Sequence, residues 1–206
     1  MLAAIKQWRT ALAVTAVIAA APAAAAAQTV MLGGMANGLQ EVPPVTTTSG
    51  MGTTSLMYNQ ATGMISVMAS FSGLTGTTVG VGPGNAPAHI HIAPPGANGP
   101  IAIPLIGVPA GVNAFANYSR NFTFAELLSI GVDAGIVTNL QTTLNGLVGR
   151  PVGTVANLYL NVHTTAVQAG EIRANLAVVP EPSTYALLAT GIAGLGVVAR
   201  RRRQRA

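Results

Sequence analysis

The chain has 206 residues, only 7% of them charged, and it contains no cysteine, which excludes disulfides, thiol catalysis and thiolate metal sites. Its formal net charge of +5 would suit a nucleic-acid-binding protein, but seven of its ten basic residues lie in residues 1–27 and 180–206. Between residues 28 and 179, three basic residues face four acidic ones, so no nucleic-acid partner is expected.

The N-terminal segment has the features of an export signal. Lys6 and Arg9 precede an apolar run over residues 11–21, and Ala23–Ala27 supply small residues for cleavage. This order predicts that residues 1–27 form a signal peptide with a short helix, removed by signal peptidase. An uncleaved N-terminal anchor is the alternative.

The middle region, residues 28–179, consists of short alternating runs separated by Gly, Pro, Asn and Thr. In residues 64–71 apolar and small polar side chains alternate, which is typical of a strand with one buried face. The pattern predicts an all-β domain, an antiparallel β-sandwich, with one helical insert over 124–148. The predicted strands are 29–35, 53–58, 64–71, 87–92, 100–105, 118–124, 155–163 and 171–178.

The three histidines of the chain fall in two of these strands. His89 and His91 alternate with Ile90 and Ile92, so both imidazoles leave the strand on the polar side. The same alternation applies to two later strands. The polar residues expected together on the solvent side of the sheet are His89, His91, Asn161, His163, Glu171 and Arg173.

This polar cluster has three interpretations. His89, His91 and His163 are candidate ligands for copper or zinc, because imidazoles at i and i+2 of a strand point the same way. Alternatively, the six side chains only hydrogen-bond neighbouring strands and loops, with Glu171 pairing an imidazole or Arg173. The third interpretation is recognition of an external ligand. A histidine cluster also predicts acid sensitivity below about pH 6.5.

Four motifs carry a family resemblance. They are Leu39–Val45, Ala88–His91, Asn161–Thr164 and Gly170–Arg173, in the order and approximate spacing of a CHRD (chordin-type) domain. The chain resembles this family over about residues 29–178. The resemblance implies an immunoglobulin-like or superoxide-dismutase-like β-sandwich in an exported protein. The long 106–152 segment departs from the family pattern.

Two charged residues within these motifs suggest a further contact. Glu41 lies beside Pro43 and Pro44, which favour an extended edge conformation, and Arg173 lies in the last strand. We expect an ion pair between them that clamps the first strand to the last; two independently solvated charges are the alternative.

The C-terminal segment, residues 180–206, is tripartite. An apolar stretch from Tyr185 to Ala199, about 22 Å long as a helix, separates a Pro-Glu-Pro motif from an arginine cluster. It resembles the PEP-CTERM sorting signal of Gram-negative bacteria, which implies an exosortase-type enzyme, transient anchoring in the inner membrane and extracellular polysaccharide. An ordinary C-terminal transmembrane helix is the alternative. The predicted sorting residues are Pro180, Glu181, Pro182, Arg200, Arg201 and Arg202.

Together these features predict a non-enzymatic surface or extracellular-matrix protein, exported across the inner membrane and active in a biofilm-like setting. The alternative is an extracellular binding module that uses the polar cluster to bind a metal, glycan or protein. An enzyme is not expected, because a dismutase-like site would need a fourth histidine and an aspartate-containing zinc set. No cofactor is expected apart from the candidate copper or zinc.

Overall fold

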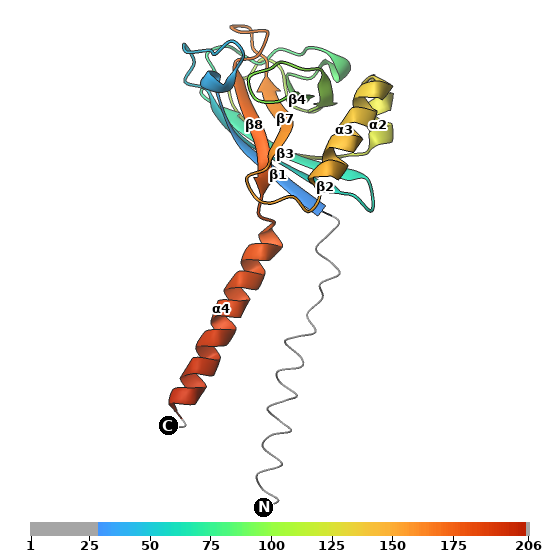
Figure 1. Cartoon of the computed structure of the whole chain (residues 1–206). Coiled ribbons are helices and arrows are strands. Elements are labelled where there is room, and N and C mark those ends of the chain that lie inside the picture. The colour runs from blue at the N-terminus through green and yellow to red at the C-terminus, as the bar shows by residue number, and fades with distance from the viewer. Residues whose placement is uncertain (1–28, 205–206) are drawn as a thin grey trace, which may run out of the picture.

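Eight antiparallel strands form one continuous, strongly curved sheet in the computed structural model, which describes residues 29–204 (Figure 1). The predicted signal peptide lies outside the described residues. The strand order is β5-β4-β7-β8-β1-β2-β3-β6. The predicted all-β, sandwich-like fold is confirmed. The strands are β1 (Thr29–Asn37), β2 (Met51–Asn59), β3 (Met64–Ser72), β4 (Ala88–Ile92), β5 (Ile101–Pro104), β6 (Phe115–Phe122), β7 (Val155–Val162) and β8 (Ile172–Val179).

The inner, concave face of the sheet carries the apolar core. Strand β3 shows this alternation: Ile65, Val67 and Phe71 are buried, while Met64 and Met68 on the opposite face are exposed. The hairpin joining β2 to β3 fixes this register, because the side chain of Asn59 accepts hydrogen bonds from the backbone N–H groups of residues 61 and 62. A one-residue slip would turn the whole apolar set to the other face.

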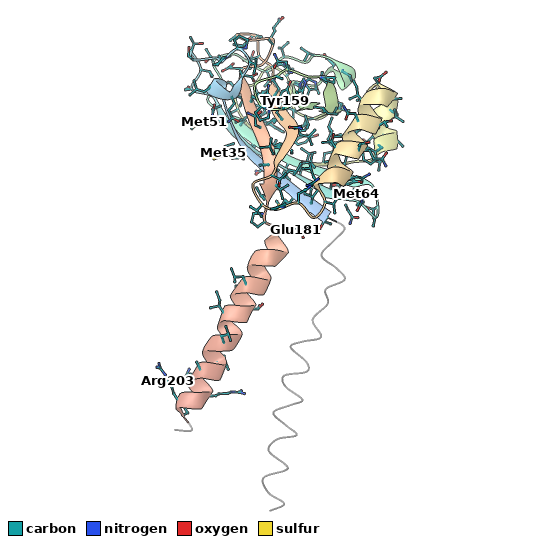
Figure 2. All side chains as sticks on the ribbon, viewed as in Figure 1. Met35, Met51, Met64, Tyr159, Glu181 and Arg203 are labelled. Atoms are coloured by element: carbon teal, nitrogen blue, oxygen red, sulfur yellow. The ribbon has the colours of Figure 1, made fainter. Side chains whose placement is uncertain are left out.

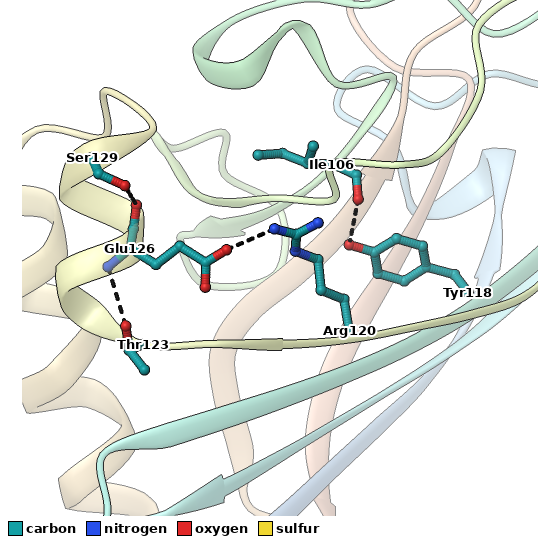
Figure 3. Close-up of polar contacts among 6 residues, drawn as sticks. All are labelled: Ile106, Tyr118, Arg120, Thr123, Glu126 and Ser129. Atoms are coloured by element: carbon teal, nitrogen blue, oxygen red, sulfur yellow. Dashed lines mark hydrogen bonds and ion pairs between the residues drawn. The ribbon is translucent and has the colours of Figure 1, made fainter.

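Two helices, α2 (Phe124–Ser129) and α3 (Ala134–Leu147), form the predicted insert and pack against the core. Thr123 and Asp133 cap them by accepting hydrogen bonds from first-turn N–H groups. Glu126 of α2 also forms an ion pair with Arg120 of β6, with 2.7 Å between Oε1 and Nη2 (Figure 3). Short 3₁₀ helices occur at η1 (Gly38–Gln40) and η2 (Pro83–Asn85).

The outer face of the sheet, opposite the core, divides into two halves. The covered half comprises β4, β7 and β8, where the outward side chains of His89, His91, Tyr159, Asn161 and Arg173 are buried, although Val155 at the start of β7 is exposed. The open half comprises β1, β2, β3 and β6, and Met35 and Met51 project from it on the side away from α2 and α3 (Figure 2). The exposed methionines of the open half are Met35, Met51, Met57, Met64 and Met68, between 41% and 72% exposed.

The C-terminal segment forms helix α4 (Pro182–Arg203), which extends from the end of β8 away from the sheet (Figure 1). Glu181, at the start of this segment, accepts a hydrogen bond from the Thr29 hydroxyl, with 2.5 Å between the oxygens. Both ends of the domain therefore leave the sheet at the same end. Within residues 29–204, none of the helices combines the length and apolarity needed to cross a membrane. The transmembrane helix predicted within residues 180–206 is not found among these described helices.

Candidate metal centre

Two neighbouring strands of the covered half bring the three histidines together. In the β4–β7 register His89 lies opposite Asn161 and His91 opposite Tyr159, and His163 follows β7 on the same face. The ring centroids of His89 and His163 are 4.9 Å apart, those of His89 and His91 5.7 Å, and those of His91 and His163 6.1 Å. We refer to these three side chains as the histidine cluster.

One nitrogen of each imidazole is hydrogen-bonded to a backbone carbonyl. His89 Nε2 lies 3.1 Å from the oxygen of Val81, and His91 Nδ1 lies 2.9 Å from that of Gly99. His163 Nδ1 lies 2.8 Å from the oxygen of Gln168. A carbonyl only accepts, so each of these nitrogens carries the proton and the other nitrogen keeps a lone pair. Three different loops thus fix the tautomers of the three rings.

The remaining nitrogens are His89 Nδ1, His91 Nε2 and His163 Nε2. All three are buried and have no hydrogen-bond partner among residues 29–204. One potential ligand atom from each of the three residues lies within 4.8 Å of the other two. Buried polar atoms are nearly always paired, so three unpaired atoms in one place call for a specific explanation.

The surroundings keep the cluster neutral. Burial, together with the neighbouring His163 and His91, lowers the pKa of His89 to about 3. Burial also lowers the pKa of His91, to about 4, although the hydrogen bond to Gly99 opposes the shift. The pKa of His163 is lowered by burial as well. Neutral imidazoles with free lone pairs are the form that binds a metal ion.

The predicted solvent-facing position of the six polar residues is wrong. They do project from the face opposite the aliphatic side chains, as alternation predicts, but they are only 0–7% exposed. Loops 73–87, 93–100 and 163–171 cover this half of the sheet and contribute the carbonyl groups described above. The cluster is therefore an interior feature of the molecule.

Arg173 and Tyr159 hold one of the covering loops in place. Arg173 donates hydrogen bonds to the carbonyls of Ala97 and Pro94 and to the side chain of Asn98. Its guanidinium carbon lies 3.5 Å from the centroid of the Tyr159 ring, which stacks on His91 at 4.8 Å. Figure 2 shows Tyr159 inside the domain, among the strands and loops. The Tyr159 hydroxyl accepts a hydrogen bond from the N–H of Gly99, the residue whose carbonyl orients His91.

Glu171 belongs to a different network. Its carboxylate accepts hydrogen bonds from the hydroxyls of Thr48 and Thr164 and from the N–H groups of Thr75 and Gly76. Burial alone would raise the pKa of this carboxyl, but the four hydrogen bonds outweigh it and lower the pKa. The predicted pairing of Glu171 with an imidazole or Arg173 is wrong, because its oxygens join three loops instead.

Glu41 is buried and approaches Asn161, whose Nδ2 lies 3.5 Å from Glu41 Oε2. Burial raises the pKa of Glu41 to about 7, although the positive charge of Arg173 opposes the shift. The predicted Glu41–Arg173 ion pair is not formed, since the guanidinium donates to loop 93–98 and Asn175. Asn161 also packs tightly against Gly170, where an added Cβ would lie 2.1 Å from Asn161 Oδ1.

Sequence reasoning identified the three imidazoles but missed their surroundings. Tyr159, which links Arg173 to His91, was detectable because it shares the face of Asn161 in the alternation. The carbonyls of Val81, Gly99 and Gln168 carry no residue-specific signal, because every residue has a carbonyl group. The arrangement as a whole offers three oriented nitrogen ligands in a water-poor interior.

Two family models match the chain. The CHRD domain model matches residues 35–176, and the model of the PEP-CTERM protein-sorting motif matches residues 178–203. Searches of curated proteins and of solved structures each gave no significant match. The chain therefore belongs to the CHRD domain family, and its PEP-CTERM motif implies export, processing by an exosortase-type enzyme and sorting to the cell surface.

Proposed function

We propose that this protein binds one copper or zinc ion through His89, His91 and His163. The observation that carries the proposal has two parts: one potential ligand atom from each of the three histidines lies within 4.8 Å of the others, and each ring has a buried nitrogen without a hydrogen-bond partner. Leaving a buried polar atom unpaired costs about 1–3 kcal/mol. A single cation shared by the three lone pairs removes that cost at all three atoms.

The second nitrogens strengthen the proposal. Metal-binding histidines usually donate their other N–H to a carbonyl or carboxylate, which fixes the ring and its tautomer. All three rings have such a carbonyl partner, at 2.8–3.1 Å. The alternative, in which the rings serve only as hydrogen-bonding groups, accounts for one nitrogen of each ring and leaves the other three unexplained.

The protein acts without catalysis, at the cell surface or in an extracellular polysaccharide matrix. Three of its five acidic side chains have structural roles: Glu171 joins loops, Glu126 forms an ion pair and Asp133 caps a helix. The buried position of the six polar residues argues against their direct recognition of a glycan or protein. The family match and the sorting motif support a function outside the cytoplasm.

The test is metal content and metal-dependent stability of the exported protein as it is recovered from cells. We expect about one equivalent of copper or zinc, lost after treatment with a strong chelator. Restoring the ion at 100 times its dissociation constant should add about 2.7 kcal/mol to the free energy of unfolding. Thermal denaturation should report this as an increase of several degrees.

The His91→Gln variant should lose this metal-dependent stabilisation, because glutamine supplies no imidazole nitrogen. Met57→Gln is the matched control, since it places the same side chain on a strand of the open half. Equal metal binding by both variants, or stability of the parent protein unchanged by copper and zinc, would contradict the proposal.

A further inference from the structure

The histidine cluster supplies no negative charge to balance that of a bound metal ion. Its three donors are neutral, and no carboxylate joins the group of potential ligands found among residues 29–204. The carboxylate of Glu171 is engaged by four hydrogen-bond donors, and Glu41 contacts Asn161. The charge of a bound ion would therefore remain uncompensated within the ligand set.

A permanent positive charge lies one aromatic ring away. The guanidinium of Arg173 stacks on Tyr159, and Tyr159 stacks on His91 with an interplanar angle of 11°. The hydrogen bonds that Arg173 makes go to neutral groups: three loop acceptors and Asn175. Its charge disfavours added positive charge at the His91 ring, which lies on the other side of Tyr159.

The uncharged ligand set and the nearby charge of Arg173 both disfavour a dication more than a monocation. The cost of moving an ion from water into a low-dielectric interior rises with the square of its charge, so it is about four times larger for a 2+ ion. Repulsion from Arg173 rises in proportion to the charge and is about twice as large. The donor number acts in the same direction. Cu(II) prefers a tetragonal set, and zinc held by three histidines needs a water as its fourth ligand, which would have to enter this buried site.

On the basis of the proposed function, we propose that the histidine cluster is a three-coordinate Cu(I) site that excludes Zn(II) and Cu(II). Cu(I) carries a single charge and is stable with three nitrogen ligands, so it matches both the charge and the number of donors.

The geometry requires only a small closure of the site. Three nitrogens at about 2.0 Å from a metal in a trigonal arrangement lie about 3.5 Å from one another. The potential ligand atoms all lie within 4.8 Å of one another, so the rings close by at most about 1.3 Å on binding. The rings are inclined at 50–87° to one another rather than stacked, so each nitrogen can approach a common centre from its own direction.

The test is a competition on chelator-stripped, full-length protein under anaerobic conditions, with buffered Cu(I) and Zn(II) as probes. We expect one equivalent of Cu(I), bound at least 100-fold more tightly than Zn(II), and an X-ray absorption spectrum of Cu(I) with three nitrogen neighbours. Tighter binding of Zn(II), or a bound Cu(II) signal in electron paramagnetic resonance that persists with reductant, would overturn the Cu(I) assignment alone. Failure of all three ions to bind would overturn the proposed function as well.

Arg173→Gln tests the electrostatic argument. Loss of the nearby charge should reduce the preference for Cu(I) over Zn(II) by roughly tenfold, because the repulsion felt by a 2+ ion decreases more. Met57→Gln on the open half should leave the preference unchanged. An unchanged preference in folded Arg173→Gln would overturn the role of this charge. If that variant does not fold, the competition on the parent protein still decides the ion.

Discussion

The two halves of the outer sheet face have the same strand geometry and opposite surroundings. On the covered half, His89, Tyr159 and Arg173 lie under loops and are at most 1% exposed. On the open half, Met35 and Met68 occupy equivalent outward positions and are 72% and 55% exposed. Strand alternation decides which face a side chain takes, whereas the loops decide whether that face meets water. The candidate metal centre lies on the half of the outer face that the loops bury.

The largest expected effect comes from Glu171, which joins the covering loops. Glu171→Ala leaves two backbone N–H groups and two threonine hydroxyls without their charged acceptor. We expect the free energy of unfolding to fall by about 3 kcal/mol or more, measured by urea denaturation.

The matched control is Glu126→Ala, which removes a carboxylate from a partly exposed ion pair. Its cost should be below about 1 kcal/mol. Equal decreases in the free energy of unfolding of Glu171→Ala and Glu126→Ala would contradict the claim that the buried carboxylate stabilises the protein more than the partly exposed one.

Acid should selectively weaken the covered half. The pKa values of the three histidines are lowered in the folded protein, so below about pH 6.5 the unfolded chain binds protons that the folded chain does not. Stability is therefore lost as pH falls from about 6.5 towards 4. Glu41 acts in the opposite sense, because its raised pKa lets the folded chain bind a proton as pH falls below about 7.

The three histidines destabilise the folded protein as pH falls, and the single carboxyl of Glu41 offsets only part of this effect. The free energy of unfolding of the metal-free protein should therefore decrease by on the order of 2 kcal/mol between pH 6.5 and 5. Urea denaturation across this pH range measures it. His89→Gln should make stability less dependent on pH, because one of the three histidines with a lowered pKa is removed. A flat profile for the parent protein would show that the imidazoles are not buried in the neutral form.

A smaller effect is expected at the contact between Tyr159 and the covering loop. Tyr159→Phe removes the hydroxyl that accepts a hydrogen bond from Gly99 N–H, at 3.1 Å, and keeps the ring between Arg173 and His91. We expect a loss of about 1–2 kcal/mol in the free energy of unfolding. Amide hydrogen exchange at Gly99 should accelerate in the same variant, and unchanged exchange would mean that the hydroxyl does not hold the loop.

The smallest effect is expected on the open half. Met68→Ser replaces an exposed side chain whose cross-strand neighbours are Ser55 and Ser119. Stability should change by no more than about 0.5 kcal/mol, measured by thermal and urea denaturation. A loss of 2 kcal/mol would indicate that the open half is also covered in solution.

Much of the sheet was predictable because the alternation of apolar and polar residues along a strand depends only on neighbouring residues in the sequence. Residues 64–71 were expected as a strand and form β3, and the insert over 124–148 contains α2 and α3. The shared face of His89, His91 and His163 follows from the same alternation.

The burial of that face was not predictable. Loops 73–87 and 93–100 have no periodicity, and their position depends on long-range hydrogen bonds such as those from Arg173 to Ala97 and from Thr75 to Glu171. A carboxylate that binds loop N–H groups looks the same in the sequence as one that pairs with arginine. The expected solvent exposure was therefore wrong, although the residues were correctly grouped on one face.

The most direct test is anomalous X-ray diffraction from crystals of the full-length protein loaded with copper. A single strong peak about 2.0 Å from His89 Nδ1, His91 Nε2 and His163 Nε2 is the predicted result. Copper scattered over surface sites, with the three nitrogens bonded to water or to one another, would contradict the central claim that this buried cluster is a metal centre.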